Sequence, residues 1–152
     1  MKLTSTYLPL SVICLFLSCE QKTNQLPLEG TWELISATST EGDTTFSTFD
    51  ATRSMIKILN PTHFAFLNHV RDSKRDSTAA PFSAGGGTYT LVDSTYTEHL
   101  DYFVDPAWEQ HTFVFTVKID QDTLIQKGVE KVEELGIDRI ITEKYRRVKP
   151  NP

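Results

Sequence analysis

The sequence contains little cysteine. It has two, Cys14 and Cys19, and both lie near the start of the chain. No thiol follows Cys19, so the remainder of the chain cannot form an internal disulfide. Thiol catalysis, zinc–thiolate sites and iron–sulfur clusters are excluded there because each needs cysteine side chains. A folded domain after Cys19 must therefore be stabilised by its own hydrophobic core.

An excess of positive charge is also missing. The chain carries 15 lysines and arginines against 20 aspartates and glutamates, which gives a net charge of −5. A nucleic-acid-binding domain would need a basic stripe, so we expect no nucleic-acid partner. The sequence shows no internal repeat, and its length suits one domain, which we expect to be a monomer.

Long hydrophobic runs are absent except at the start of the chain. Lys2 precedes an apolar stretch at 7–17, and Ser18 and Cys19 follow it. A basic start, an apolar stretch of about ten residues and a small residue before the cut are typical of a secretory signal. The stretch is shorter than the ~20 apolar residues of a membrane-spanning helix. We therefore predict a signal peptide over 1–18, with a buried segment of the fold as the alternative.

The end of this stretch, Phe16-Leu-Ser-Cys19, resembles the lipobox of bacterial lipoproteins, in which the cysteine is acylated and becomes the mature N-terminus. Phe16 departs from the leucine or other aliphatic residue that is usual at its position. The resemblance implies palmitate-type chains on Cys19, a polar tether over 19–27 and a lipid anchor in the bacterial cell envelope. Glu20 is not the aspartate that often signals inner-membrane retention, so the outer membrane is favoured.

Strand patterns fill the rest of the chain. Segments rich in Thr, Tyr, Phe, Val and Ile alternate with turn signals such as Asn60-Pro61 and Asp105-Pro106. The most helix-like window is Val129–Leu135, where a continued strand and a loop fit as well. The pattern predicts an all-β domain, an antiparallel sandwich or barrel. We expect strands over residues 30–36, 53–59, 62–70, 86–92, 95–104, 111–120, 122–129 and 138–148.

The expected strand at 95–104 carries a carboxylate, Glu98, in the middle of an otherwise apolar face. The apolar residues of that face are Tyr96, Leu100, Tyr102 and Val104. A carboxylate on an inward face loses hydration and must be paired or protonated. Glu98 is therefore either a polar anchor for a ligand or a partner in a structural ion pair. The strand at 111–120 alternates regularly, with Phe113 and Phe115 on its inward face.

The first and last expected strands carry a family resemblance. Gly30-Thr-Trp32 begins the first strand, and Tyr145-Arg-Arg-Val148 ends the last. A Gly-x-Trp followed by a late arginine resembles the signature of the lipocalins, within the calycin superfamily. The chain from 28 to 149 is similar to small bacterial lipocalin-like lipoproteins, with 150–152 left as a tail.

The resemblance implies an antiparallel up-and-down β-barrel of about eight strands. Gly30, Trp32 and Arg147 would close one end, with the arginine guanidinium over the indole face. A planar cation over tryptophan is worth about 0.5–2 kcal/mol. Arg147 is favoured over Arg146 because it shares strand parity with Tyr145.

The interior of such a barrel holds side chains or one small ligand. The resemblance therefore implies binding of a small apolar or amphipathic molecule, without a cofactor. Two alternatives stay open: an accessory surface lipoprotein with a filled barrel that acts through protein partners, and an enzyme that uses Glu98 and interior tyrosines. The candidate ligand-lining residues are Glu98, Tyr89, Tyr96, Tyr102, Phe113 and Phe115.

Motifs for catalysis or metal binding are absent from the sequence. No serine lies in a Gly-x-Ser-x-Gly motif, and the four histidines lack the spacing of a metal site. We therefore expect a protein that is not an enzyme, with no catalytic residue and no metal ligand. The glycine run at 85–87 lacks the Gly-Lys-Ser/Thr of a phosphate loop and precedes a strand. It predicts a bulge, or a position that needs a positive φ.

Overall fold

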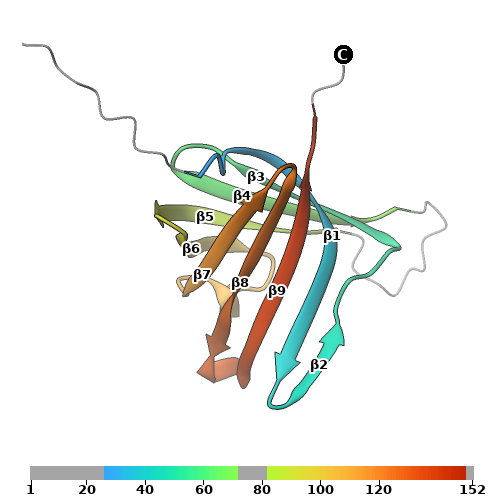
Figure 1. Cartoon of the computed structure of the whole chain (residues 1–152). Helices are drawn as coiled ribbons and strands as arrows, with labels where there is room; N and C mark the ends of the chain where they lie inside the picture. Colours follow the sequence, from blue (N-terminus) through green and yellow to red (C-terminus); the bar gives the residue numbers. More distant parts are fainter. Residues whose placement is uncertain (1–25, 72–81, 150–152) are drawn as a thin grey trace, which may run out of the picture.

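The computed structural model describes residues 26–71 and 82–149, and in them the chain forms one antiparallel sheet of nine strands (Figure 1). Its strands are β1 (Gly30–Glu41), β2 (Thr44–Ser47), β3 (Arg53–Leu59), β4 (His63–Val70), β5 (Phe82–Val92), β6 (Thr95–Phe103), β7 (Thr112–Asp120), β8 (Thr123–Val132) and β9 (Ile137–Arg147). Two short 3-10 helices, η1 (Pro106–Trp108) and η2 (Glu133–Leu135), connect strands. The predicted signal peptide, Cys19 and the tail at 150–152 lie outside the described residues.

The sheet closes into a barrel because β1 pairs with β9. Apart from β2, strands that follow one another in the chain lie side by side, so the topology is up-and-down. Eight strands form the closed barrel. The remaining strand, β2, pairs only with β1, at the end of β1 over residues 38–41. The predicted fold, an antiparallel lipocalin-like barrel of about eight strands, is confirmed.

All eight expected strands form, with small changes at their ends. β5 begins at Phe82 rather than at 86, so the glycine run lies within the strand. The helix-like window at Val129–Leu135 divides between β8, which continues to Val132, and η2. Gly136 follows η2 in the left-handed conformation, with a φ of 65°, and reverses the chain into β9.

One end of the barrel is closed by the beginning of the described chain. The guanidinium carbon of Arg147 lies 4.0 Å from the centroid of the Trp32 ring, so Arg147 rather than Arg146 covers the indole. Arg147 also donates to the carbonyl oxygens of Glu29 at 2.8 Å and Pro27 at 2.5 Å. The Trp32 indole donates to the carbonyl of Leu28 at 2.8 Å. The described N-terminal segment is thus held across this end.

Gly30 is required at this end for two physical reasons. Its φ is +129°, which side chains with a Cβ rarely adopt. A Cβ at this position would also lie 2.8 Å from a guanidinium nitrogen of Arg147. A glycine here therefore lets the backbone approach the arginine that covers Trp32.

The strand register fixes which residues lie at the opposite end. Gly30 pairs with Leu59 and Trp32 with Arg147, so the start of β1 and the ends of β3 and β9 meet at the closed end. Both ends of the described chain lie there (Figure 1). The β8–β9 connection lies at the far end, which we call the open end, together with η1.

A β-bulge between β5 and β6 changes the parity of β6. Gly87 pairs with Leu100 but Gly86 pairs with Tyr102, so one residue of β6 is skipped. The expectation that Tyr102 lines the interior is therefore wrong, because the residue is 72% exposed. Glycine is needed at the bulge because the two strands approach closely there: a Cβ at Gly87 would collide with the backbone of β6. A positive φ is not needed, because φ is positive at none of Gly85, Gly86 and Gly87.

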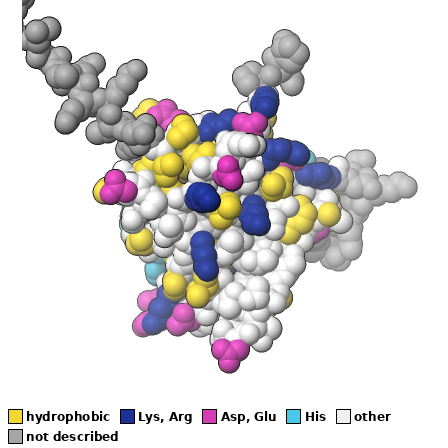
Figure 2. Space-filling model, in the orientation of Figure 1, with side chains coloured by type: hydrophobic (Ala, Val, Ile, Leu, Met, Phe, Trp, Pro, Cys, Tyr) yellow, Lys and Arg dark blue, Asp and Glu magenta, His cyan; other side chains and the backbone are white. Residues whose placement is uncertain are grey.

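The outer surface of the barrel is mixed in character. On the face shown in Figure 2, lysines, arginines and acidic side chains are interspersed with scattered hydrophobic ones. Several of the exposed apolar residues lie in β7, β8 and β9, which cross this face, namely Val114, Val129 and Ile140. Val114 pairs with Val129, and Val129 pairs with Ile140, so the three form a short apolar row across the strands. Exposed apolar side chains are common on folded proteins.

Candidate functional site

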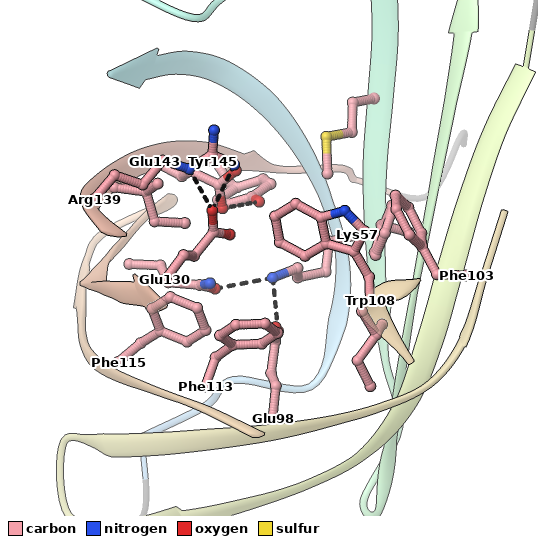
Figure 3. Close-up of a pocket in the computed structure, with 15 residues that line it drawn as sticks. Lys57, Glu98, Phe103, Trp108, Phe113, Phe115, Glu130, Arg139, Glu143 and Tyr145 are labelled. Atoms are coloured by element: carbon pink, nitrogen blue, oxygen red, sulfur yellow. Dashed lines mark hydrogen bonds and ion pairs between the residues drawn. The ribbon is translucent and has the colours of Figure 1, made fainter. Parts of the chain in front are cut away.

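The barrel contains a cavity that opens away from the closed end. Its volume is about 290 Å³, close to the lower limit of about 300 Å³ for small-molecule pockets. Strands β3, β4, β6, β7, β8 and β9 and helix η1 contribute to its wall (Figure 3). The lining residues are Met55, Lys57, Phe66, Glu98, Leu100, Phe103, Trp108, Phe113, Phe115, Gln126, Glu130, Arg139, Ile141, Glu143 and Tyr145.

A buried ion pair lies in the deep part of the cavity. The Lys57 ammonium donates to Oε1 of Glu98 at 2.8 Å and to Oε1 of Gln126 at 2.9 Å (Figure 3). The Lys57 and Glu98 side chains are 4% and 9% exposed, respectively. Removing two charges from water is costly, and the short contacts and the amide offset that cost. Glu98 is thus in an ion pair that also borders the cavity.

Aromatic rings enclose the ammonium of Lys57. Its nitrogen lies 5.7 Å from the centroid of Phe64, 5.8 Å from Tyr96 and 5.5 Å from Tyr145. Ring faces attract a cation at this distance. Two hydrogen-bond acceptors and three aromatic rings therefore hold the Lys57 ammonium in place.

Aromatic side chains also form the outer wall of the cavity. Trp108 comes from η1, which begins because Asp105 accepts a hydrogen bond from the Ala107 backbone and Pro106 occupies the first turn. Its ring centroid lies 6.1 Å from that of Phe103 and 6.2 Å from that of Phe113. These rings offer an apolar surface to whatever enters from the open end.

A second ion pair lies nearer the open end. Arg139 donates to Oε2 of Glu130 through Nε at 2.8 Å and through Nη2 at 2.7 Å. The arginine guanidinium also lies 5.8 Å from the centroid of Trp108. The side chains are 32% and 17% exposed, so water reaches this pair more than it reaches Lys57 and Glu98.

A third carboxyl, Glu143, faces the cavity without a basic partner. It accepts a hydrogen bond from the Tyr145 hydroxyl at 2.6 Å. The Glu143 side chain is half-buried. Its accessible part borders the cavity, and the rest is surrounded by protein atoms inside the barrel. Desolvation raises the pKa of Glu143 above its usual value, and Lys57 opposes part of that rise.

This carboxyl makes the stability of the protein depend on pH. A raised pKa means that the folded state holds the Glu143 proton more tightly than the unfolded chain. The protonated Glu143 carboxyl contributes its full stabilisation below about pH 4.5, the pKa of Glu143 in the unfolded chain. This contribution is lost as pH rises through the pKa of Glu143 in the folded protein. Glu143→Gln, which is neutral at every pH, is expected to melt at a higher temperature than wild type above pH 4.5. Thermal unfolding of both proteins across pH measures this, and a gap that does not widen as pH rises would contradict it.

Three of the six candidate lining residues border the cavity, namely Glu98, Phe113 and Phe115. Tyr96 is buried beside it, with its ring 5.1 Å from Tyr89 and 6.4 Å from Phe115, and does not line it. Tyr89 lies toward the closed end and donates to the Asn60 carbonyl at 2.6 Å. It borders a separate hollow there, and the expectation that Tyr89 and Tyr96 line the main cavity is therefore wrong.

Several lining residues were not anticipated from the sequence. Lys57 had a usable signal, because it shares strand parity with Met55 and Leu59 and so lies on an apolar face, as Glu98 does. The signal was ambiguous, however, because Ile56 and Ile58 make the other face of β3 apolar as well. Trp108 lies in a connection, where strand parity gives no information.

Two further observations concern membranes and metals. In residues 26–71 and 82–149, no helix is long and apolar enough to cross a membrane. Over the same residues, no group of three or more His, Cys, Asp or Glu side chains is arranged to hold a metal ion.

One family model matches the chain. It is described as a domain of unknown function, DUF4488, and it covers residues 27–152, so the chain belongs to this family. No curated protein matches the chain. The family boundary at residue 27 lies just before the first strand of the barrel.

Proposed function

We propose that this member of the DUF4488 family is a lipid-anchored envelope protein whose barrel binds a small amphipathic molecule. The cavity is the observation that carries the proposal. It combines aromatic walls with polar groups at a few fixed positions, which is the usual composition of a small-molecule site. The apolar part of a ligand would contact Trp108, Phe103 and Phe113, and its polar end would reach the deeper polar groups.

The anchor is proposed from the sequence at 16–19, with Cys19 as the acylated residue. The described chain begins at the closed end of the barrel, and the cavity opens at the other. A tether over 19–27 would therefore attach opposite the cavity mouth, which leaves the mouth accessible when the protein is anchored. The outer membrane remains the favoured location, and mass spectrometry of the native protein that shows an unmodified Cys19 thiol would reject the anchor.

A filled cavity is expected to abolish binding. Ile141 lines the cavity, whereas its neighbour Ile140 is 40% exposed on the outside of the same strand. Ile141→Trp adds bulk inside, and we expect it to remove binding of 1-octanol, a probe with an apolar tail and one hydroxyl. Isothermal titration calorimetry of the purified protein with 1-octanol measures this effect.

Ile140→Trp is the matched control, since it adds the same side chain outside the barrel. It is expected to bind 1-octanol as wild type does, with an unchanged circular dichroism spectrum. Wild-type protein that fails to bind 1-octanol, or Ile141→Trp protein that binds it normally, would contradict a binding role for the cavity.

An enzymatic role is the second candidate, because titratable groups converge in the cavity. Lys57 and Glu98 lie within hydrogen-bond distance, and Glu143 carries a raised pKa. We rank this role below binding because Lys57 and Glu98 bond to one another, which leaves neither available as a free acid or base. An accessory protein with a filled barrel ranks lower still, since the barrel holds a cavity.

A further inference from the structure

We propose that the ligand of this cavity carries a cationic head, such as a primary ammonium, and that the Glu143 carboxyl receives it. The inference rests on the proposed function and names the class of ligand: an amine with an apolar tail rather than a fatty acid. It follows from the balance of charged groups around the cavity and from the partners that each group already has.

The cavity is lined by two cations and three carboxyl groups. Lys57 is bonded to Glu98, and Arg139 is bonded to Glu130 through two nitrogens. Within the described residues no lysine, arginine or histidine lies at ion-pair distance from Glu143, whose hydrogen-bond partner is the Tyr145 hydroxyl. Both lining cations are thus already paired with a carboxylate, and Glu143 is the one lining carboxyl without an ion-pair partner.

An anionic ligand would meet unfavourable surroundings. The ammonium of Lys57 has three N–H donors, and Glu98 and Gln126 take two of them. Aromatic rings surround the same ammonium at 5.5–5.8 Å. A fatty-acid carboxylate placed in the deep cavity would thus approach Glu98 and Glu143 without a free cation to offset the repulsion.

A cationic ligand would find complementary chemistry. Its ammonium can donate to Glu143, and its tail can lie along Phe103, Trp108 and Phe113, which border the path to the open end. Aromatic faces also attract a cation as it passes. Burial raises the pKa of Glu143, and a cation bound beside the carboxyl would lower that pKa and so favour release of its proton.

Three probes with the same tail test this, namely octylammonium, 1-octanol and octanoate, each titrated calorimetrically into the purified protein. Wild type is expected to bind octylammonium about tenfold or more tightly than octanoate, the factor for one charge-assisted hydrogen bond. Glu143→Gln is expected to lose this preference, so that octylammonium and octanoate bind to it with similar affinity. Glu134→Gln, at an exposed carboxylate outside the cavity, is the control and keeps the preference.

A measurement on wild type alone provides a second readout. The groups around Glu143 are Lys57, Glu98, Glu130, Arg139 and the hydroxyls of Tyr96 and Tyr145, and burial raises the pKa of both tyrosines. Octylammonium stays charged up to about pH 10, as a lysine does. Its affinity is therefore expected to rise with pH above 4.5 as Glu143 gives up its proton, with proton release visible in buffers of different ionisation enthalpy.

The outcomes separate this inference from the proposed function. If 1-octanol does not bind to wild type, the binding role itself fails. If 1-octanol binds but octanoate binds as tightly as octylammonium, the cavity is a ligand site without selectivity for cations, and the inference alone is overturned. It is also overturned if Glu143→Gln keeps the preference, or if octylammonium affinity does not rise with pH.

Discussion

Replacing Lys57 with methionine is expected to lower the free energy of unfolding by about 3–5 kcal/mol, the cost of leaving a buried charge without its partner. Glu98 would remain inside the barrel, where its side chain is 9% exposed, with no cation at 2.8 Å. The Gln126 carbonyl would lose its donor as well. Urea denaturation monitored by circular dichroism measures the loss.

The double variant Lys57→Met/Glu98→Leu separates the cost of an unpaired charge from the value of the pair. Because two apolar side chains of similar size need no partners, the double variant is expected to recover most of the lost stability. Lys131→Met, which removes an exposed lysine that pairs with Glu133, should leave the unfolding midpoint unchanged. A double variant as unstable as the single one would show that Lys57 stabilises the barrel by packing rather than by neutralising Glu98.

Replacing Trp32 with alanine is expected to destabilise the barrel by about 3–5 kcal/mol, the range for removing a large buried aromatic side chain. The indole has no exposed surface. Its loss leaves a void at the closed end and removes the face that Arg147 covers and the donor that holds the Leu28 carbonyl. Thermal and urea unfolding of the variant measure the effect.

The second tryptophan of the chain is the matched control, since Trp108 lies at the cavity wall and is only partly buried. Trp108→Ala is expected to cost less stability than Trp32→Ala and to weaken 1-octanol binding. Equal losses of stability in the two variants would argue that the closed end has no special role in holding the barrel together.

Strand alternation predicted an antiparallel sandwich or barrel, because it reports burial directly. The choice of a closed barrel came from the lipocalin resemblance at Gly30, Trp32 and Arg147. Strand alternation also identified Glu98 as an unusual residue, since a carboxylate on an apolar face must have a partner or a ligand. The sequence pattern could not identify the partner of Glu98. Lys57 lies 41 positions earlier in the chain, and its contact with Glu98 depends on the closure of the barrel.

Parity failed where the strands are irregular. The bulge opposite Gly86 and Gly87 turns Tyr102 outward and Phe103 inward, and a second bulge in β1 lies between Leu34 and Ser36. One skipped residue reverses every later side chain of a strand. The glycine run indicated the first bulge in the sequence. The exact position of the bulge could be assigned only from the register of β5 and β6.

The central claim is that the barrel cavity holds a small amphipathic molecule in the cell. Native mass spectrometry of the protein purified from its own cell, as wild type and as Ile141→Trp, tests it most directly. We expect wild type to carry an additional mass that denaturation releases, and the Ile141→Trp variant to lack it. Wild-type protein whose mass equals that of the acylated chain alone, before and after denaturation, would contradict the claim.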